Sequence, residues 1–123
     1  MDRYHQVALF LKALAHPVRL SILEALRDEG QYVQHLTHAL GRRQANVSQH
    51  LAVLREAGLV TAQREGMNVI YRLKDRRVLE VLDAAVGIVA DMHPEAFAQT
   101  QPYPRRRRGG CGCPRCRRGW EGS

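Results

Sequence analysis

The chain has 123 residues, of which 45% are hydrophobic, and a formal net charge of +7. That length fits one domain with additional segments and leaves little room for two hydrophobic cores. No apolar run reaches the roughly 18–20 residues that a membrane-spanning helix needs, and the N-terminus lacks the basic-then-apolar order of a secretory signal. We therefore expect a cytoplasmic protein with no membrane partner, whose cysteines are thiols or metal ligands.

The positive charge is unevenly distributed along the chain. Residues 1–100 carry 12 Lys or Arg against 11 Asp or Glu, whereas residues 101–123 carry 7 Arg against the single Glu121. A basic segment attracts any polyanion, so it indicates nucleic acid without indicating a sequence. We divide the chain into a domain over residues 1–94 and a basic, cysteine-rich tail over residues 95–123, which offers nothing to pack and should be mobile without a ligand.

Apolar residues at helical spacing predict five helices in the first domain. They cover about residues 4–16, 17–28, 33–40, 44–57 and 75–91. Pro17 suits the first turn of the second helix, where its missing N–H costs nothing. Gly41 is typical of the position just after a helix C-terminus.

The period changes after the fourth helix. Residues 59–64 and 69–73 are predicted to be strands, and Glu65 to Asn68 to form the turn between them, with Gly66 supplying the permissive backbone angles. A short helix, a tight turn, a longer helix and a hairpin define a winged helix-turn-helix. The expected fold class is therefore mainly α with a two-stranded β-hairpin wing.

The fifth helix is apolar over more than half of its circumference. The residues concerned are Val78, Leu79, Val81, Leu82, Ala85, Val86, Ile88 and Val89. A terminal helix of this kind needs a second surface to bury against. We expect a homodimer formed through the first and last helices; the alternative is a helix buried in the chain's own core.

The fourth helix buries Val47, Leu51 and Leu54 on one face and offers small polar groups on the other. Gln and Asn can pair with an adenine edge in the major groove, and arginines ahead of the helix can hold phosphates. A solvated helix face has the same composition, which is the alternative. The candidate DNA-binding residues are Arg42, Arg43, Gln44, Ala45, Asn46, Ser48, Gln49, His50, Arg64 and Asn68.

Three segments in register carry a family resemblance. Residues 13–23 look like the "ALA-x-P-x-R-L-x-I-L" opening of ArsR/SmtB repressors, residues 47–60 resemble their "V-S-x-H-L-x-x-L-R-E-A-G-L-V" recognition helix, and residues 64–73 resemble their "R-E-G-x-x-V-x-Y-R-L" wing. The likeness covers about residues 5–90. It implies a homodimeric repressor of double-stranded DNA on an inverted-repeat operator, released by an inducer. Arg43 stands where the family often has a Ser or Thr helix cap.

The two sensor sites common in that family are absent from this sequence. The positions of the arsenic-responsive cysteine cluster hold Tyr32, Gln34 and Thr37. The positions of the zinc-type site hold Asp75-Arg76-Arg77 at the start of the last helix, and Ile88 and Asp91 toward its end. The Asp91-Met92-His93 string is interpreted as helix-end polarity, and His35 and His38 as solvated or capping residues; a metal-ligand role is the alternative for each.

The remaining candidate is the tail, where Cys111, Cys113 and Cys116 have C-x-C-x2-C spacing. Three thiolates suit a soft ion such as arsenite, zinc or copper(I), and a ligand from the partner chain could join them. Nearby Arg108, Arg115, Arg117 and Arg118 are expected to lower the thiol pKa values. Alternatively two cysteines form a disulfide or polysulfide and sense an oxidant or reactive sulfur, or the tail is inert.

No combination of nucleophile, base and orienting group is recognisable, so an enzyme is not expected. The remaining alternative is a non-specific nucleic-acid-binding protein that uses the arginine tail.

Overall fold

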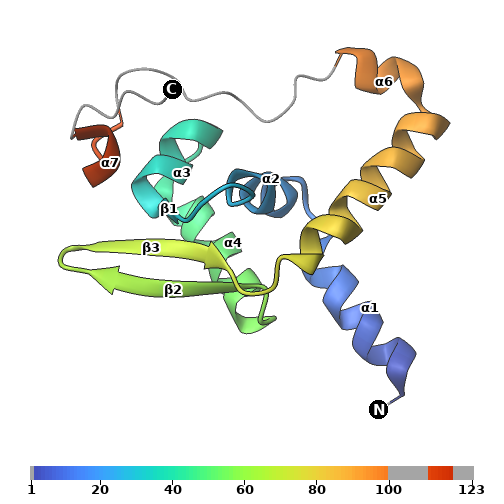
Figure 1. Cartoon of the computed structure of the whole chain (residues 1–123), viewed down its shortest axis with the longest axis horizontal. Coiled ribbons are helices and arrows are strands. Elements are labelled where there is room, and N and C mark those ends of the chain that lie inside the picture. Colours follow the sequence, from blue (N-terminus) through green and yellow to red (C-terminus); the bar gives the residue numbers. More distant parts are fainter. Residues whose placement is uncertain (1, 100–110, 118–123) are drawn as a thin grey trace.

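The computed structural model describes residues 2–99 and 111–117 (Figure 1). The predictions that concern Arg105 to Arg108 and Arg118 lie outside these residues. The described residues form seven helices and one three-stranded antiparallel sheet. In chain order the elements are α1 (Arg3–Leu14), α2 (Pro17–Ala25), β1 (Gln31–Tyr32), α3 (Val33–Leu40), α4 (Gln44–Glu56), β2 (Val60–Glu65), β3 (Asn68–Leu73), α5 (Arg77–Met92), α6 (Pro94–Gln99) and α7 (Pro114–Arg117).

The junction between α1 and α2 is fixed by local capping. The ring Nδ1 of His16 accepts a hydrogen bond from the Val18 backbone N–H at 3.1 Å, and Pro17 is the first residue of α2. His16 therefore has the extended conformation of a helix N-cap and cannot continue α1. For this reason α1 ends at Leu14, slightly earlier than the sequence pattern predicts.

The wing contains one strand more than predicted. β2 and β3 form the expected hairpin, with Val60 opposite Leu73 and Glu65 opposite Asn68, and Gly66 turns the chain at φ +61°. β1 adds to the other side of β3, giving the order β1-β3-β2. The predicted two-stranded hairpin is confirmed. Strand β1 was not predicted, because two residues are too few to show an alternating pattern.

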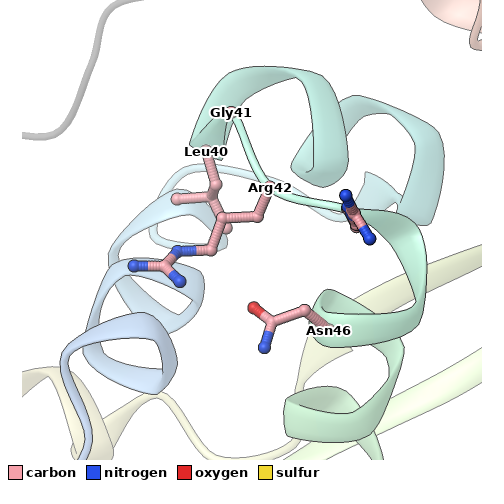
Figure 2. A pocket seen from close by; sticks show the side chains of 5 residues that line it. Leu40, Gly41, Arg42 and Asn46 are labelled. Carbon is pink, nitrogen blue, oxygen red and sulfur yellow. The ribbon is translucent and has the colours of Figure 1, made fainter.

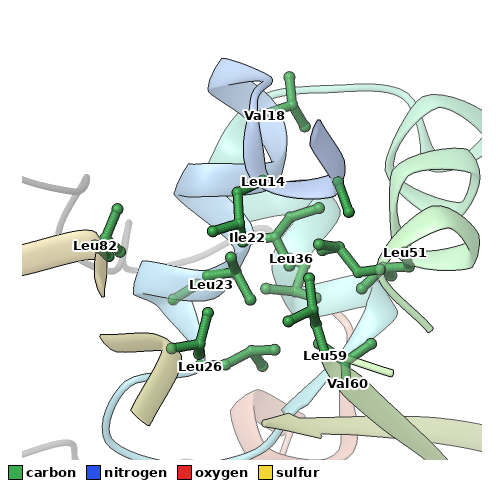
Figure 3. Close-up of a cluster of buried hydrophobic side chains, with 14 of the residues drawn as sticks. Leu14, Val18, Ile22, Leu23, Leu26, Leu36, Leu51, Leu59, Val60 and Leu82 are labelled. Carbon is green, nitrogen blue, oxygen red and sulfur yellow. The ribbon is translucent and has the colours of Figure 1, made fainter. Parts of the chain in front are cut away.

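The core lies between α2, α3 and α4 (Figure 3). Ile22 and Leu23 from α2, Leu36 from α3 and Leu51 and Leu54 from α4 are fully buried there. The predicted inward face of the fourth helix is confirmed, because Val47 is fully buried as well. This packing directs the opposite face of α4 away from the body of the domain.

Helices α1 and α5 project from the same side of the domain and keep much of their apolar surface exposed (Figure 1). Only Val78, Leu79 and Leu82 of α5 are buried in the single chain. The alternative in which this helix is buried in the chain's own core was therefore wrong. The exposed large apolar side chains are Tyr4, Val7, Leu9 and Leu11 on α1 and Val81, Val86, Ile88, Val89 and Met92 on α5.

Contacts of Arg27 attach α5 to the core. The guanidinium of Arg27 donates to the carboxylates of Glu24 and Asp83, and Arg76 donates to the Arg27 carbonyl at 2.6 Å. The hydrogen bond from Arg27 holds the pKa of Asp83 below its usual value. In the described part of the chain no single helix is both long and apolar enough to cross a membrane; α1 and α2 reach that length and composition only as a pair, across an 83° bend.

We predict that Leu51→Ala lowers the free energy of unfolding by about 2–5 kcal/mol, because it leaves a cavity between α4 and the rest of the core. Urea denaturation followed by circular dichroism measures the change. The control is Gln34→Ala, which changes an exposed side chain and should alter stability by no more than about 0.5 kcal/mol. Equal stabilities for the two variants would contradict this packing.

Candidate DNA-binding face and metal centre

The outer face of α4 is polar and accessible. Gln44, Ala45, Ser48 and Gln49 are exposed on it, and Asn46 is half-buried at its edge. No side chain caps the helix at Arg43, as the departure from the family pattern predicts. The first-turn N–H groups of α4 are therefore not occupied by a side chain from that position, at the end of the helix that usually enters the groove.

Two arginines flank the start of this helix. Arg42, Arg43 and Asn46 line one pocket together with Leu40 and Gly41 (Figure 2). Gly41 adopts the left-handed conformation at φ +63°, and its N–H bonds the His38 carbonyl, so α3 stops there and the chain turns into α4. The turn thus places positive charge beside the helix N-terminus, where an anion is favoured.

His50 lies beneath this face and connects α4 to α2. Its ring Nδ1 accepts a hydrogen bond from Arg19 Nε at 3.2 Å, and its centroid lies 4.2 Å from that of His16. Burial, followed by the charges of His16, Arg19 and Arg42, lowers the pKa of His50. His50 is therefore held neutral and half-buried at neutral pH, and its contact with DNA stays a prediction.

The wing brings two further predicted residues to its tip. Arg64 is exposed near the end of β2, and Asn68 begins β3 opposite Glu65. The hairpin extends away from the core, with its tip at the far end from α4 (Figure 1). Arg42 and Arg43 therefore lie beside the N-terminus of α4. Arg64 and Asn68 lie separately, on the wing.

The three cysteines lie around one histidine. The Nδ1 atom of His35 is 3.8 Å from Cys111 Sγ, 4.0 Å from Cys113 Sγ and 3.7 Å from Cys116 Sγ. The four candidate ligand atoms all lie within 4.8 Å of one another, close enough to hold a metal ion. Among the described residues, no other group of three or more His, Cys, Asp or Glu side chains has this geometry.

The segment 111–117 is packed against the sheet, so the prediction that the tail offers nothing to pack was wrong there. Cys113 is fully buried in a small cluster with Tyr32 and Ile70. Arg115 donates to Gln31 Oε1 at 3.1 Å and pairs with Glu29 at 3.0 Å. Apolar contact and hydrogen bonds to β1 and the loop before it therefore fix the segment.

The expectation that arginines lower every thiol pKa was wrong for two of the cysteines. Burial raises the pKa of Cys111, and burial together with hydrogen bonding to Cys113 raises the pKa of Cys116 to about 12. For Cys113 burial also opposes ionisation, but the Cys116 N–H and the two neighbouring thiols stabilise its thiolate, so its pKa is lowered. For Cys111 and Cys116, desolvation by burial is the largest cause of the shift.

His35 is the residue of this cluster that the sequence analysis did not select as a ligand. Its side chain is only 5% exposed, so the interpretation as a solvated or capping residue was wrong. His38, one turn further along α3, is half-buried and does not belong to the cluster. The sequence carried one indication of a further ligand, because three cysteines leave a four-coordinate ion one ligand short. Asp91 and His93 are exposed at the end of α5.

Comparison with known proteins agrees with this architecture. Residues 14–63 match the family model described as a helix-turn-helix domain. The chain is 42% identical over 99 residues to the HTH-type transcriptional regulator NmtR of Mycobacterium tuberculosis, covering 74% of this chain and 82% of that protein. It is 48% identical over 77 residues to the HTH-type transcriptional repressor SmtB of the same organism, covering 63% of this chain but only 57% of SmtB.

A solved structure of a similar protein has the same fold. The homodimeric winged helix-turn-helix DNA-binding domain of Mb0332 from Mycobacterium bovis, described as a possible ArsR-family transcriptional regulator, superposes with a TM-score of 0.63 at 36% identity and covers 80% of this chain and 90% of that one. The fold and the polar face of α4 define a winged helix-turn-helix DNA-binding protein. This chain belongs to the ArsR/SmtB family of transcriptional regulators.

Proposed function

We propose that this protein is a non-enzymatic repressor that binds an inverted-repeat operator as a homodimer and is released when a soft metal or metalloid ion binds Cys111, Cys113 and Cys116. The observation that carries the proposal is the convergence of three thiols on α3, the helix directly before the recognition helix α4. Thiolates suit soft ions, so the ligand set indicates that the signal is a soft metal or metalloid ion.

The dimer is supported by the apolar surfaces of α1 and α5. Large apolar side chains remain exposed on both helices. Exposed apolar surface of this kind marks a protein–protein contact, and Mb0332, which this chain resembles, is a homodimer. A two-fold dimer presents two copies of α4. Such a pair fits half-sites about one helical turn, roughly 34–36 Å, apart, which is why we propose an inverted repeat.

Release requires that the ion bind the DNA-free conformation more tightly than the DNA-bound one. The cluster is connected through packed neighbours to two elements that carry proposed DNA contacts, α4 and the wing. His35 belongs to α3, which packs against α4. Tyr32, which packs with Cys113, donates a hydrogen bond to Glu65 of the wing at 2.7 Å. An ion that repositions the cluster would therefore act on both.

The redox alternative is supported less well by the same residues. A disulfide uses only two of the three sulfur atoms, and His35 would serve there to activate one thiol instead of contacting all three. One buried histidine that faces three thiols is the arrangement of a metal centre. We therefore favour an ion as the inducer. In the redox alternative, the inducer is an oxidant or polysulfide.

We predict that Gln49→Ala weakens binding to the operator by about 1–3 kcal/mol while leaving affinity for random DNA unchanged, because Gln49 reads a base edge. Arg42→Ala should weaken both and reduce the salt slope by about one, because Arg42 neutralises a phosphate. Fluorescence anisotropy at several salt concentrations measures this, on a duplex enriched by the wild-type protein from a random pool. Equal affinity of the wild type for operator and random duplexes would contradict a specific repressor.

We predict that zinc, arsenite or copper(I) releases the reduced wild-type protein from that duplex, because ion binding favours the free conformation. The protein with Cys111→Ser, Cys113→Ser and Cys116→Ser should bind the same duplex and stay bound at every ion concentration. Anisotropy with increasing ion measures release, and a chelator should restore binding.

Two outcomes would contradict the metal proposal. Release of the triple serine variant by the same ion would place the sensor elsewhere. Release of the wild type by polysulfide or peroxide, with no response to any ion, would assign the cysteines to thiol redox sensing.

A further inference from the structure

We propose that His35 is the fourth ligand of this centre, and that the Cys3His set selects a four-coordinate divalent ion of the zinc class over arsenite. The inference rests on the proposed function for the presence of a metal ion at the cysteines. It adds a ligand from a different part of the fold and narrows the class of ion.

The distances fit a tetrahedral centre. With metal–sulfur bonds of about 2.3 Å and metal–nitrogen bonds of about 2.0–2.1 Å, tetrahedral geometry places nitrogen and sulfur about 3.6 Å apart. The three separations from His35 Nδ1 are 3.7, 3.8 and 4.0 Å. Because they are nearly equal, the imidazole nitrogen caps the triangle of sulfurs instead of approaching a single thiol.

A capping nitrogen distinguishes between the candidate ions. Trivalent arsenic bound to three thiolates is pyramidal, and its lone pair occupies the fourth direction. An imidazole nitrogen in that direction would face the lone pair and gain no bond. A divalent zinc-class ion has no such lone pair and takes Cys3His as one of its ordinary tetrahedral ligand sets.

In the docked segment, neighbouring groups orient the ligand atoms. The Cys116 N–H donates to Cys113 Sγ at 3.4 Å, a hydrogen bond that orients this sulfur and stabilises negative charge on it. Arg115, between the last two cysteines, is attached to Glu29 and Gln31. His35 and Cys113 are both more than nine-tenths buried, so the imidazole is already desolvated and directed at the thiols.

The inference is tested by measuring zinc and arsenite affinity separately on the reduced full-length protein. Competition with a chromophoric chelator gives the zinc affinity, and calorimetric titration gives the arsenite affinity. His35→Ala should weaken zinc binding at least about 100-fold, because loss of a ligand exceeds the 10- to 100-fold effect of losing an outer-shell partner, and should leave arsenite binding unchanged. The control His38→Ala removes an imidazole from the same helix and should behave as wild type.

A second variant covers the case in which His35→Ala does not fold. His35→Cys keeps a soft ligand, so it should retain zinc binding. The cobalt(II) spectrum of the wild type should show tetrahedral ligand-field bands with thiolate charge transfer, and the charge-transfer intensity should rise in His35→Cys.

The possible failures are distinguishable. Zinc affinity unchanged in His35→Ala, or an octahedral cobalt(II) spectrum in the wild type, would remove His35 from the centre. Zinc and arsenite affinities falling equally in His35→Ala would remove the selectivity. Both results leave a cysteine-based sensor intact. A wild-type protein that binds neither of these ions nor copper(I) would overturn the proposed function itself.

Discussion

Helix α3 is packed on two sides, and the DNA-binding face and the thiol cluster both depend on it. Leu36 enters the core that supports α4, while His35 faces the sulfur atoms. Protein interiors are close-packed, so a displacement on one side of a short helix is transmitted to the other. The eight residues from Val33 to Leu40 therefore connect the two sites through direct contacts.

The attachment of residues 111–117 explains why an ion can act as a signal. The apolar contact is confined to Cys113, Tyr32 and Ile70 with the flanking cysteines. The Arg115–Glu29 pair is partly exposed, and pairs of this kind contribute about 0–1 kcal/mol. Fixing the backbone costs about 1–2 kcal/mol per residue, so the docked state is poorly favoured by these contacts alone. An ion that bonds His35 and the cysteines supplies the missing free energy and couples docking to its own concentration.

The helix-turn-helix could be predicted because local patterns determine it. Val47, Leu51 and Leu54 recur at helical spacing, and Gly66 provides the turn of the wing. Strand β1 could not be predicted from the sequence, because it is recognisable only by its pairing with β3. His35 lies more than 70 residues from the nearest cysteine, so no spacing rule joins them. The thiol pKa values were misjudged because sequence reveals charge but not burial.

The central claim is that the fold assembles one metal centre from α3 and the distant cysteine segment. X-ray absorption at the zinc edge of the zinc-loaded full-length protein in solution tests it most directly. The account predicts three sulfur atoms at about 2.3 Å and one nitrogen at about 2.0 Å from the metal. A shell of four sulfur atoms, which would require thiols shared between subunits, or a shell of nitrogen and oxygen alone would contradict it.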